Sequence, residues 1–495
     1  MATTRPISRR QFLSTLGLAG LTLAAGRTGF AQAPAKPRNL VFILIDDMRF
    51  DAMGFMNPYY ETPHMDQLAA NGMVFENCFV TTSLCSPSRA SILSGQFAHT
   101  HGVLDNGTLL PKGTPTFPQE LQKSSYNTAF IGKWHMGGSS DAPRPGFNHW
   151  VSFRGQGNYR DQTFNVNGEQ VPRKGHTTDL IADYAVDFLK DTGDGPFCLY
   201  LSHKAVHAHF DPPERYKGSY AGKEFPKPAS MANTEENYRG KPEWVKRQRQ
   251  SWHGVDGMYN EKMDFDTFVK SYPELLRAVD DSVGRVVETL RAAGKLDDTL
   301  ILFTSDNGFQ FGEHGLIDKR TMYEASIKVP LIAHCPALFK GGQRRTELVQ
   351  NIDFAPTMLE AAGRPIPDTV QGRSFYGVLD GTEKNWRDAI LYEYFWERAF
   401  PHTPTVLGVR TERHKFMRYH GVWDRYELYD LQEDPDEMNN LLGDYLPENQ
   451  AGQLDFLIRR TAPEPLKKLF NEMSAKLDKL LEDTGCAREP NWRPW

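Results

Sequence analysis

Four short apolar runs, each ending in polar residues capable of chemistry, most constrain what this chain can fold into. The runs cover residues 40–45, 128–131, 197–201 and 300–303. None alternates polar with apolar residues, which is typical of strands buried on both faces of a parallel sheet. The polar residues that follow them are Asp46-Asp47, Gly132-Lys133-Trp134-His135, Ser202-His203 and Asp306-Asn307.

Helical patterns lie between these runs, at residues 62–71, 176–190 and 273–293. Alternation of strands and helices predicts an α/β fold with a large mixed, mostly parallel sheet sandwiched by helices. In such sheets ligands bind at the carboxyl ends of the strands. Because the polar clusters all follow strands, we expect them to meet in one site.

The pattern changes twice along the chain, which suggests how it is divided. Residues 38–384 form the predicted main domain, and within it residues 211–271 lose the strand–helix pattern. That stretch is either an insertion that shapes a substrate site or plain surface. Residues 385–495 are predicted to form a smaller C-terminal α+β domain with an antiparallel sheet and a closing helix. Its expected strands and helix are residues 390–395, 406–410, 415–419 and 465–481.

The N-terminus has the layout of an export signal. Arg9-Arg10 form a twin-arginine pattern, an apolar stretch follows at residues 12–26, and Ala31-Gln32-Ala33 offers a small-x-small cleavage site. A transmembrane anchor is the alternative, but the stretch is short and rich in Gly, Ala and Thr. We therefore predict a signal peptide at residues 1–33 and a periplasmic or secreted protein exported by the twin-arginine route, with no stable membrane anchor.

Charge and cysteine content exclude several classes of protein. The formal net charge is −5, and no basic run carries interleaved aromatic residues, so nucleic acid is not an expected partner. The five cysteines show neither a disulfide-scaffold nor a zinc spacing. An odd number of cysteines in an exported chain raises the question of which one has another task.

The segment of residues 84–95 suggests which cysteine that is. Pro87 suits the first turn of a helix, so Cys85 is expected at a helix N-terminus, a natural anion site. Arg89 lies four residues further on and can reach back along the same helix face. On the cysteine alone, a buried structural thiol would be the simpler interpretation.

Two acidic pairs predict a metal site. Asp46-Asp47 and Asp306-Asn307 supply hard oxygen ligands at two strand ends, which suit Ca²⁺ or Mg²⁺ rather than zinc. Each pair alone is also compatible with a helix cap or a turn.

Taken together, these segments resemble the formylglycine-dependent (type I) sulfatases of the alkaline phosphatase superfamily. Residues 85–95 match the signature Cys-x-Pro-Ser-Arg followed three residues later by Leu-Ser/Thr-Gly. The resemblance implies that a formylglycine-generating enzyme oxidises Cys85, and that the hydrated gem-diol is the nucleophile that attacks sulfur. It also implies a calcium ion, with magnesium as the alternative. The implied ligands are Asp46, Asp47, Cys85, Asp306 and Asn307.

Further positions match the family's cationic and proton-carrying residues. Gly132-Lys133-Trp134-His135 resembles the family's Gly-Lys-x-His, and Lys319 resembles its last sulfate-binding lysine. The later active-site histidine is His207 or His203, and we favour His207, although Val206 and His209 replace the flanking prolines that are common there. The resemblance implies that Arg89, Lys133 and Lys319 bind sulfate, that His135 acts as a base, and that His207 or Asp306 protonates the leaving alcohol.

The motifs run from Asn39 to about Gly372, and residues 427–441 also resemble the end of these enzymes. The whole appearance is similar to sulfatases that act on glycans, such as N-acetylglucosamine-6-sulfatases, so a sulfated carbohydrate is the expected substrate. Asp105, Asn106 and His314 are candidates for sugar contacts, with ordinary surface residues as the simpler interpretation.

Two other functions are compatible with the sequence. One is a phosphodiester or phosphonate monoester hydrolase on the same scaffold, since like sites serve unlike substrates. The other is a catalytically dead protein that binds sulfated glycans.

Overall fold

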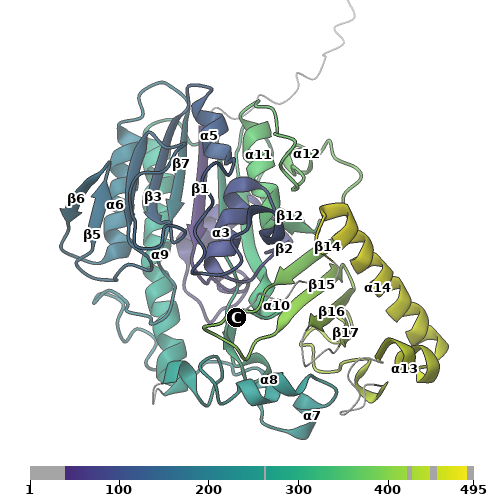
Figure 1. The fold of residues 1–495 in the computed structure, drawn as a ribbon. Coiled ribbons are helices and arrows are strands. Elements are labelled where there is room, and N and C mark those ends of the chain that lie inside the picture. The colour runs from purple at the N-terminus through teal and green to yellow at the C-terminus, as the bar shows by residue number, and fades with distance from the viewer. Residues whose placement is uncertain (1–38, 261–263, 421–425, 446–453, 488–495) are drawn as a thin grey trace, which may run out of the picture. The chain divides into compact units, whose positions relative to one another are not determined.

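The structure is a computed structural model that describes residues 39–260, 264–420, 426–445 and 454–487. Its centre is an 11-stranded sheet (Figure 1). In order across the sheet the strands are β12 (Gln343–Arg345), β2 (Met73–Phe79), β11 (Lys328–His334), β8 (Thr299–Ser305), β1 (Asn39–Ile45), β7 (Phe197–Ser202), β3 (Asn127–Lys133), β4 (His149–Phe153), β5 (Thr163–Val166) and β6 (Glu169–Pro172). The eleventh strand, β13 (Val349–Gln350), also pairs with β2.

The five central strands, from β8 to β4, are all parallel, which confirms the expected core of the sheet. Antiparallel strands flank them, because β11 pairs antiparallel with β8 and β2, and β5 and β6 close the opposite edge. The four predicted runs are β1, β3, β7 and β8.

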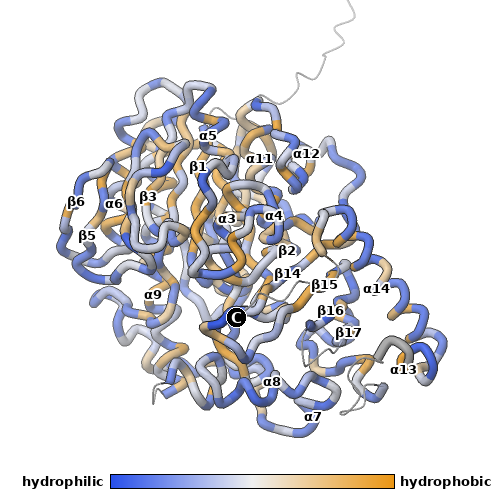
Figure 2. Tube along the Cα trace, in the orientation of Figure 1, coloured by the Kyte–Doolittle hydropathy of each residue, from blue (hydrophilic) through white to orange (hydrophobic). Residues whose placement is uncertain are grey.

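Both faces of the central strands are buried, which explains why the apolar runs do not alternate. In β1, Leu40, Phe42 and Leu44 enter one hydrophobic core, whereas Val41, Ile43 and Ile45 enter the other. The first core is covered by α3 (Cys85–Ser94), α5 (Phe117–Gln122) and α11 (Phe354–Ala361), and the second by α2 (Pro63–Ala70), α6 (Thr177–Lys190) and α9 (Phe265–Ala292). Figure 2 shows the apolar residues gathered along these strands and helices.

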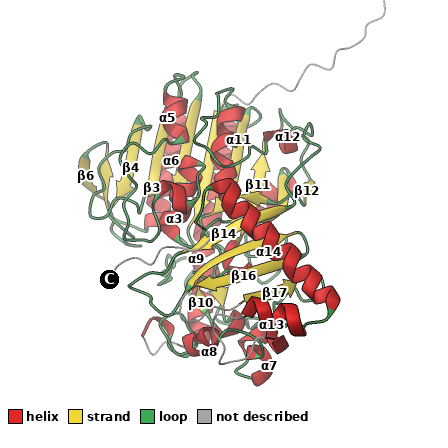
Figure 3. Ribbon diagram, turned by 45° about the vertical axis from the view of Figure 1, so that its right-hand side comes forward, coloured by secondary structure: helices red, strands yellow, loops and turns green. Residues whose placement is uncertain are grey.

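A second, four-stranded antiparallel sheet lies toward the C-terminus (Figure 3). Its order is β14 (Ala389–Tyr394), β15 (Thr405–Thr411), β16 (His414–His420) and β17 (Tyr426–Asp430). The closing helix α14 (Glu464–Thr484) packs on this sheet through Phe470, Met473 and Leu477 in a third core. The predicted C-terminal architecture is therefore confirmed, while the domain boundary at residue 385 stays a prediction.

The remaining elements are short. They are α4 (Ala98–His101), α7 (Glu235–Tyr238), α8 (Glu243–Gln248), α10 (Glu324–Ile327), α12 (Tyr376–Leu379), α13 (Leu454–Thr461) and the hairpin strands β9 (Gln310–Phe311) and β10 (Ile317–Asp318).

One helix boundary predicted from the sequence is wrong. The helix expected at residues 273–293 begins at Phe265, eight residues earlier, and Pro273 lies inside it. Asp264 caps this helix by accepting a hydrogen bond from the backbone N–H of Thr267 at 2.8 Å, which fixes the true start. The segment 211–271 therefore contains α7, α8 and the first turns of α9.

The predicted signal peptide at residues 1–33 lies outside the described residues. Within the part of the chain that the structure describes, no helix is long and apolar enough to cross a membrane.

Candidate active site

The acidic pairs meet because their strands are neighbours. Ile45 and Ser305 are paired in the β1–β8 ladder, so the residues that follow them emerge side by side at the carboxyl edge of the sheet. The backbone N–H of Asp47 donates to Asp306 Oδ1 at 3.1 Å. Asp46, Asp47 and Asp306 each offer a carboxylate oxygen within 4.8 Å of the others. All three side chains are buried, so the structure brings together the carboxylates predicted from the sequence.

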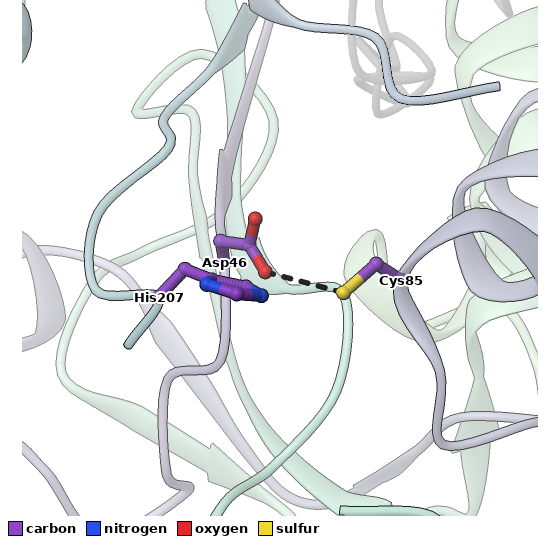
Figure 4. Close-up of side chains that lie close together, drawn as sticks. All are labelled: Asp46, Cys85 and His207. Atoms are coloured by element: carbon purple, nitrogen blue, oxygen red, sulfur yellow. Dashed lines mark hydrogen bonds between the residues drawn. The ribbon is translucent and has the colours of Figure 1, made fainter. Parts of the chain in front are cut away.

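Cys85 faces this cluster from the start of α3. Leu84 is the N-cap of that helix and Cys85 its first residue, as Pro87 in the first turn predicted. The thiol is fully buried, with its Sγ 3.5 Å from Asp46 Oδ1. Figure 4 shows Cys85 pointing toward Asp46, with the His207 ring beside the same carboxylate. A helix N-terminus aimed at a shared centre favours an anionic ligand there.

Three cationic side chains bind these carboxylates. Arg89 donates through Nε to Asp306 Oδ2 at 2.9 Å, and its Nη2 lies 3.3 Å from Asp46 Oδ2. Lys133 forms an ion pair with Asp46. Lys319 donates to Asp47 Oδ2 at 2.6 Å. Three positive charges thus balance three negative ones, and a divalent cation added to this set would leave the centre positive toward an anionic group.

In the acidic residues of the site, burial raises the pKa values and the neighbouring cationic side chains lower them. Burial alone would raise the pKa of Asp46, but the ammonium of Lys133 and the guanidinium of Arg89 hold it well below its usual range. For Asp47 burial prevails and raises the pKa to about 7, with Lys319 opposing the rise. Burial and the neighbouring Asp46 charge raise the pKa of the Cys85 thiol, which is therefore neutral and a weak nucleophile as it stands.

The structure separates the two histidines that the sequence left open. His207 Nε2 lies 3.9 Å from Asp47 Oδ2, and its ring groups with Asp46 and Cys85. His203 is fully buried, and its Nε2 bonds to the hydroxyl of Ser282 on α9 at 3.1 Å. The geometry therefore brings His207, and not His203, to the carboxylate cluster.

His135 lies next to the residue that follows Cys85. Its Nδ1 is 3.2 Å from the hydroxyl of Ser86, the residue that follows the cysteine. Burial and the charge of Lys133 lower the pKa of His135, so its neutral form can accept a proton.

The oxygen atoms of the cluster fit a hard divalent cation. Besides the three carboxylates, the side-chain Oδ1 of Asn307 is buried and has no hydrogen-bond partner among the described residues. Its amide nitrogen donates to Asp47 Oδ1 at 2.6 Å, which fixes the side chain beside the carboxylates. A buried polar atom without a partner is costly unless a ligand satisfies it. The three carboxylates and the Asn307 amide thus offer four side-chain oxygen donors, and Ca²⁺ and Mg²⁺ prefer oxygen ligands.

Several residues make contacts at the site that were not predicted from the sequence. Ser202, the last residue of β7, accepts from Arg89 Nη1 at 2.6 Å and donates to the carbonyl of Lys133 at 2.8 Å. Behind Lys319, Asp318 pairs with Arg320, which in turn pairs with Glu397 at 2.8 Å. The opposite charges of Asp318 and Arg320, two positions apart in the sequence, could have indicated the first of these ion pairs. Nothing in the sequence linked them to Glu397.

The candidate sugar-contact residues differ in where they lie. Asn106 accepts from the backbone N–H of Ser86 at 2.9 Å, next to the cysteine. Asp105 accepts from Thr108 within its own loop at 2.6 Å. His314 is buried with its ring centroid 4.0 Å from that of Tyr323, so it belongs to the interior.

Fold and site together define a hydrolase that acts on anionic esters. The chain matches the sulfatase family model over residues 38–364 and the model of the N-sulphoglucosamine sulphohydrolase C-terminal region over residues 312–461. It belongs to the sulfatase family and is a sulfuric ester hydrolase.

Relatives with names span nearly the whole chain. The N-acetylglucosamine-6-O-sulfatase of Bacteroides thetaiotaomicron is 33% identical and the N-acetylglucosamine-6-sulfatase of Homo sapiens 30% identical. The alignments cover 86% of this chain in both cases, and 86% and 84% of those proteins. Among solved structures, that of BT4656 in complex with its substrate D-glucosamine-2-N,6-O-disulfate superposes with a TM-score of 0.79. It is 30% identical, and the match covers 91% of this chain and 98% of that one.

Proposed function

We propose that this sulfatase releases sulfate from a sulfated carbohydrate, using a formylglycine made from Cys85 and a bound calcium ion. The observation that carries the proposal is the position of Cys85. It is the first residue of a buried helix N-terminus, 3.5 Å from Asp46, within a signature that matches the family without departure. The neutral thiol is a weak nucleophile, whereas a hydrated aldehyde at the same position offers two hydroxyl groups.

Calcium would be held by Asp46, Asp47, Asp306, Asn307 and the modified residue 85, with magnesium as the alternative. When bound, it would polarise the sulfate group and stabilise negative charge on the sulfate oxygens. The unpartnered Oδ1 of Asn307 supports this assignment.

The protein's own cations complete the anion site. Arg89, Lys133 and Lys319 surround the carboxylates, and each can turn a positive charge toward the sulfate oxygens as charge builds up on them. In their buried setting these interactions are stronger than they would be in water.

Proton transfers are assigned to the groups that flank residue 85. One hydroxyl of the gem-diol passes its proton to a nearby carboxylate such as Asp306 and attacks sulfur, and the bond between sulfur and the ester oxygen breaks. His207 or Asp306 gives a proton to that oxygen, so the sugar leaves as an alcohol. His135 then takes the proton of the second hydroxyl, which forms the aldehyde again as its carbon releases sulfate.

The substrate is a proposal drawn from the relatives. Two of them are named for N-acetylglucosamine 6-sulfate, and one solved neighbour holds a sulfated glucosamine. We propose N-acetylglucosamine 6-sulfate, or a related glycosaminoglycan or algal sugar, as the substrate. The twin-arginine pattern at Arg9-Arg10 supports export to the periplasm or beyond, where such glycans are met.

The test is sulfate release from a panel of mono-sulfated sugars and an aryl sulfate, with the protein co-produced with a formylglycine-generating enzyme. Release that is abolished in Cys85→Ala supports the proposal and identifies the sugar. No release from any compound, despite an aldehyde detected by mass spectrometry at position 85, would favour phosphodiesters or phosphonates instead. A cysteine retained in the mature native protein would favour the non-catalytic glycan-binding alternative.

A further inference from the structure

A cavity of about 370 Å³ follows α8, beside the active site. Its walls come from residues 248–260 and from residues 399–402 in the loop between β14 and β15. Its volume is within the range of about 300–1,000 Å³ that is typical of small-molecule sites. The first wall belongs to the segment that the sequence left open as a substrate-shaping insertion.

Among the described residues that line this cavity, none carries a charged side chain. It consists of Gln248, Gln250, Ser251, Trp252, His253, Asn260, Ala399, Phe400, Pro401 and His402. Burial lowers the pKa of His253, which keeps that ring neutral near neutral pH. A polar lining of this kind suits a ligand with hydroxyl or amide groups.

Trp252 gives the cavity a flat apolar surface. Of the four large apolar side chains that are exposed in the described residues, it is the only aromatic one. Its ring is held by Tyr259, at a centroid distance of 5.4 Å, and by Phe400, at 6.4 Å. An exposed tryptophan fixed by neighbours offers contact area at a low entropy cost. The C–H face of a sugar ring can pack on such a surface while its hydroxyl groups reach the amides.

Two sets of contacts place the cavity next to the sulfate-binding centre. On one side His253 Nε2 lies 3.1 Å from Asp318 Oδ2, and Asp318 precedes Lys319, which binds Asp47. On the other side Tyr259 packs against His209, two residues after His207, at a centroid distance of 5.2 Å. A molecule whose sulfate lies at Lys319 therefore has this cavity within its immediate surroundings.

We propose that this cavity binds the sugar ring of the sulfated substrate, with Trp252 as the platform for the ring and Gln250 as a hydrogen-bonding group. The inference rests on the proposed sulfatase function and adds a specificity site to it. The binding of the sugar ring, and not that of the sulfate group, is therefore expected to depend on Trp252 and Gln250.

The test compares two substrates in the same enzyme, a sulfated N-acetylhexosamine and an aryl sulfate that has no sugar. We expect Trp252→Ala to raise KM for the sugar about tenfold, the factor that corresponds to the loss of one aromatic contact. Its kcat/KM for the aryl sulfate should stay within a factor of two of the wild-type value. Trp252→Phe should recover most of the sugar KM.

Two further variants keep the test decisive if Trp252→Ala folds poorly. Gln250→Ala changes an exposed side chain and should raise KM for the sugar only. Ile366→Ala, another exposed apolar residue, serves as the matched control and should change neither substrate. Equal KM values for the sugar in wild type, Trp252→Ala and Gln250→Ala would overturn the inference while leaving the sulfatase activity itself established. A wild-type enzyme that cleaves neither compound would instead contradict the proposed function.

Discussion

His99 fastens the end of the C-terminal helix to the rest of the chain, and replacing it by glutamine should loosen that helix measurably. The ring faces two acceptors, with Nδ1 2.7 Å from Glu393 Oε2 and Nε2 3.0 Å from the carbonyl of Thr484, the last residue of α14. A ring that donates from both nitrogens is an imidazolium. Burial alone would lower the pKa of His99, but hydrogen bonds with Cys486 and Glu393 raise it to about 10.

The size of the effect follows from the burial of the pair. Glu393 is fully buried, and 11% of the His99 side chain is exposed. Removing one partner of a buried ion pair costs about 3–5 kcal/mol, and the residual exposure of His99 favours the lower figure. A loss of about 3 kcal/mol corresponds to roughly a hundredfold change in the equilibrium for opening α14.

Hydrogen exchange measures that equilibrium directly. At pH 6 we expect protection factors in the last turns of α14 to fall roughly a hundredfold in His99→Gln, while those of α2 stay unchanged. The pH dependence has a defined sign. Because the folded pKa of His99 is raised, its contribution is complete below about 6.5 and is lost as the pH rises toward 10. The difference between wild type and variant should shrink over that interval.

Two results would refute this reasoning. One is unchanged protection of α14 in His99→Gln at pH 6. The other is a difference that stays constant from pH 6 to pH 10, which would mean that the charge of the ring is not involved. His149→Gln, a change at a half-buried histidine outside this junction, is the matched control.

Three other outcomes are expected. Lys319→Met should lower kcat/KM for sulfate release at least about a hundredfold, the loss typical of a transition-state charge partner, and a variant with wild-type turnover would exclude Lys319 from the anion site. Removing divalent cations with a chelator should lower the midpoint temperature of thermal unfolding, and Ca²⁺ should restore it better than Zn²⁺, because the clustered donors of Asp47 and its neighbours are hard oxygens. A midpoint that neither ion changes would contradict a metal site. Gly132→Ala should not yield folded protein, since φ is +120° there and a Cβ would lie 1.8 Å from the carbonyl of Ser202; a normal circular dichroism spectrum would contradict this.

The strand ends and the residues that follow them could be predicted because they depend on local patterns. The run that ends at Asp46 and the run that ends at Asp306 are each apolar without alternation, and the ladder places them side by side. Periodicity carries no information on strand order. The antiparallel insertion of β11 between β2 and β8 was therefore not predictable from it.

Other features depend on tertiary contacts that local signals do not reveal. Pro273 looked like a helix start, but the cap at Asp264 and the packing of Phe268 and Val269 extend α9 before it. The difference between His203 and His207 is one of direction, since the first turns toward Ser282 and the second toward the carboxylates. The pairing of Arg320 with Glu397 joins segments whose proximity only the fold defines.

The burial of Cys85 sets a time limit on anything that must reach its thiol. The backbone N–H of Arg320 donates to the carbonyl of Ser83 at 3.1 Å, so the loop that carries Lys319 lies against the segment that leads into α3. Lys319 follows Cys85 by 234 positions, since 319 − 85 = 234, and at about 5–20 residues per second the ribosome needs roughly 12–47 s to add the intervening residues. During this interval the emerging chain lacks the residues that later enclose Cys85. An enzyme that modifies Cys85 during synthesis therefore has tens of seconds in which the cysteine lies in accessible nascent polypeptide.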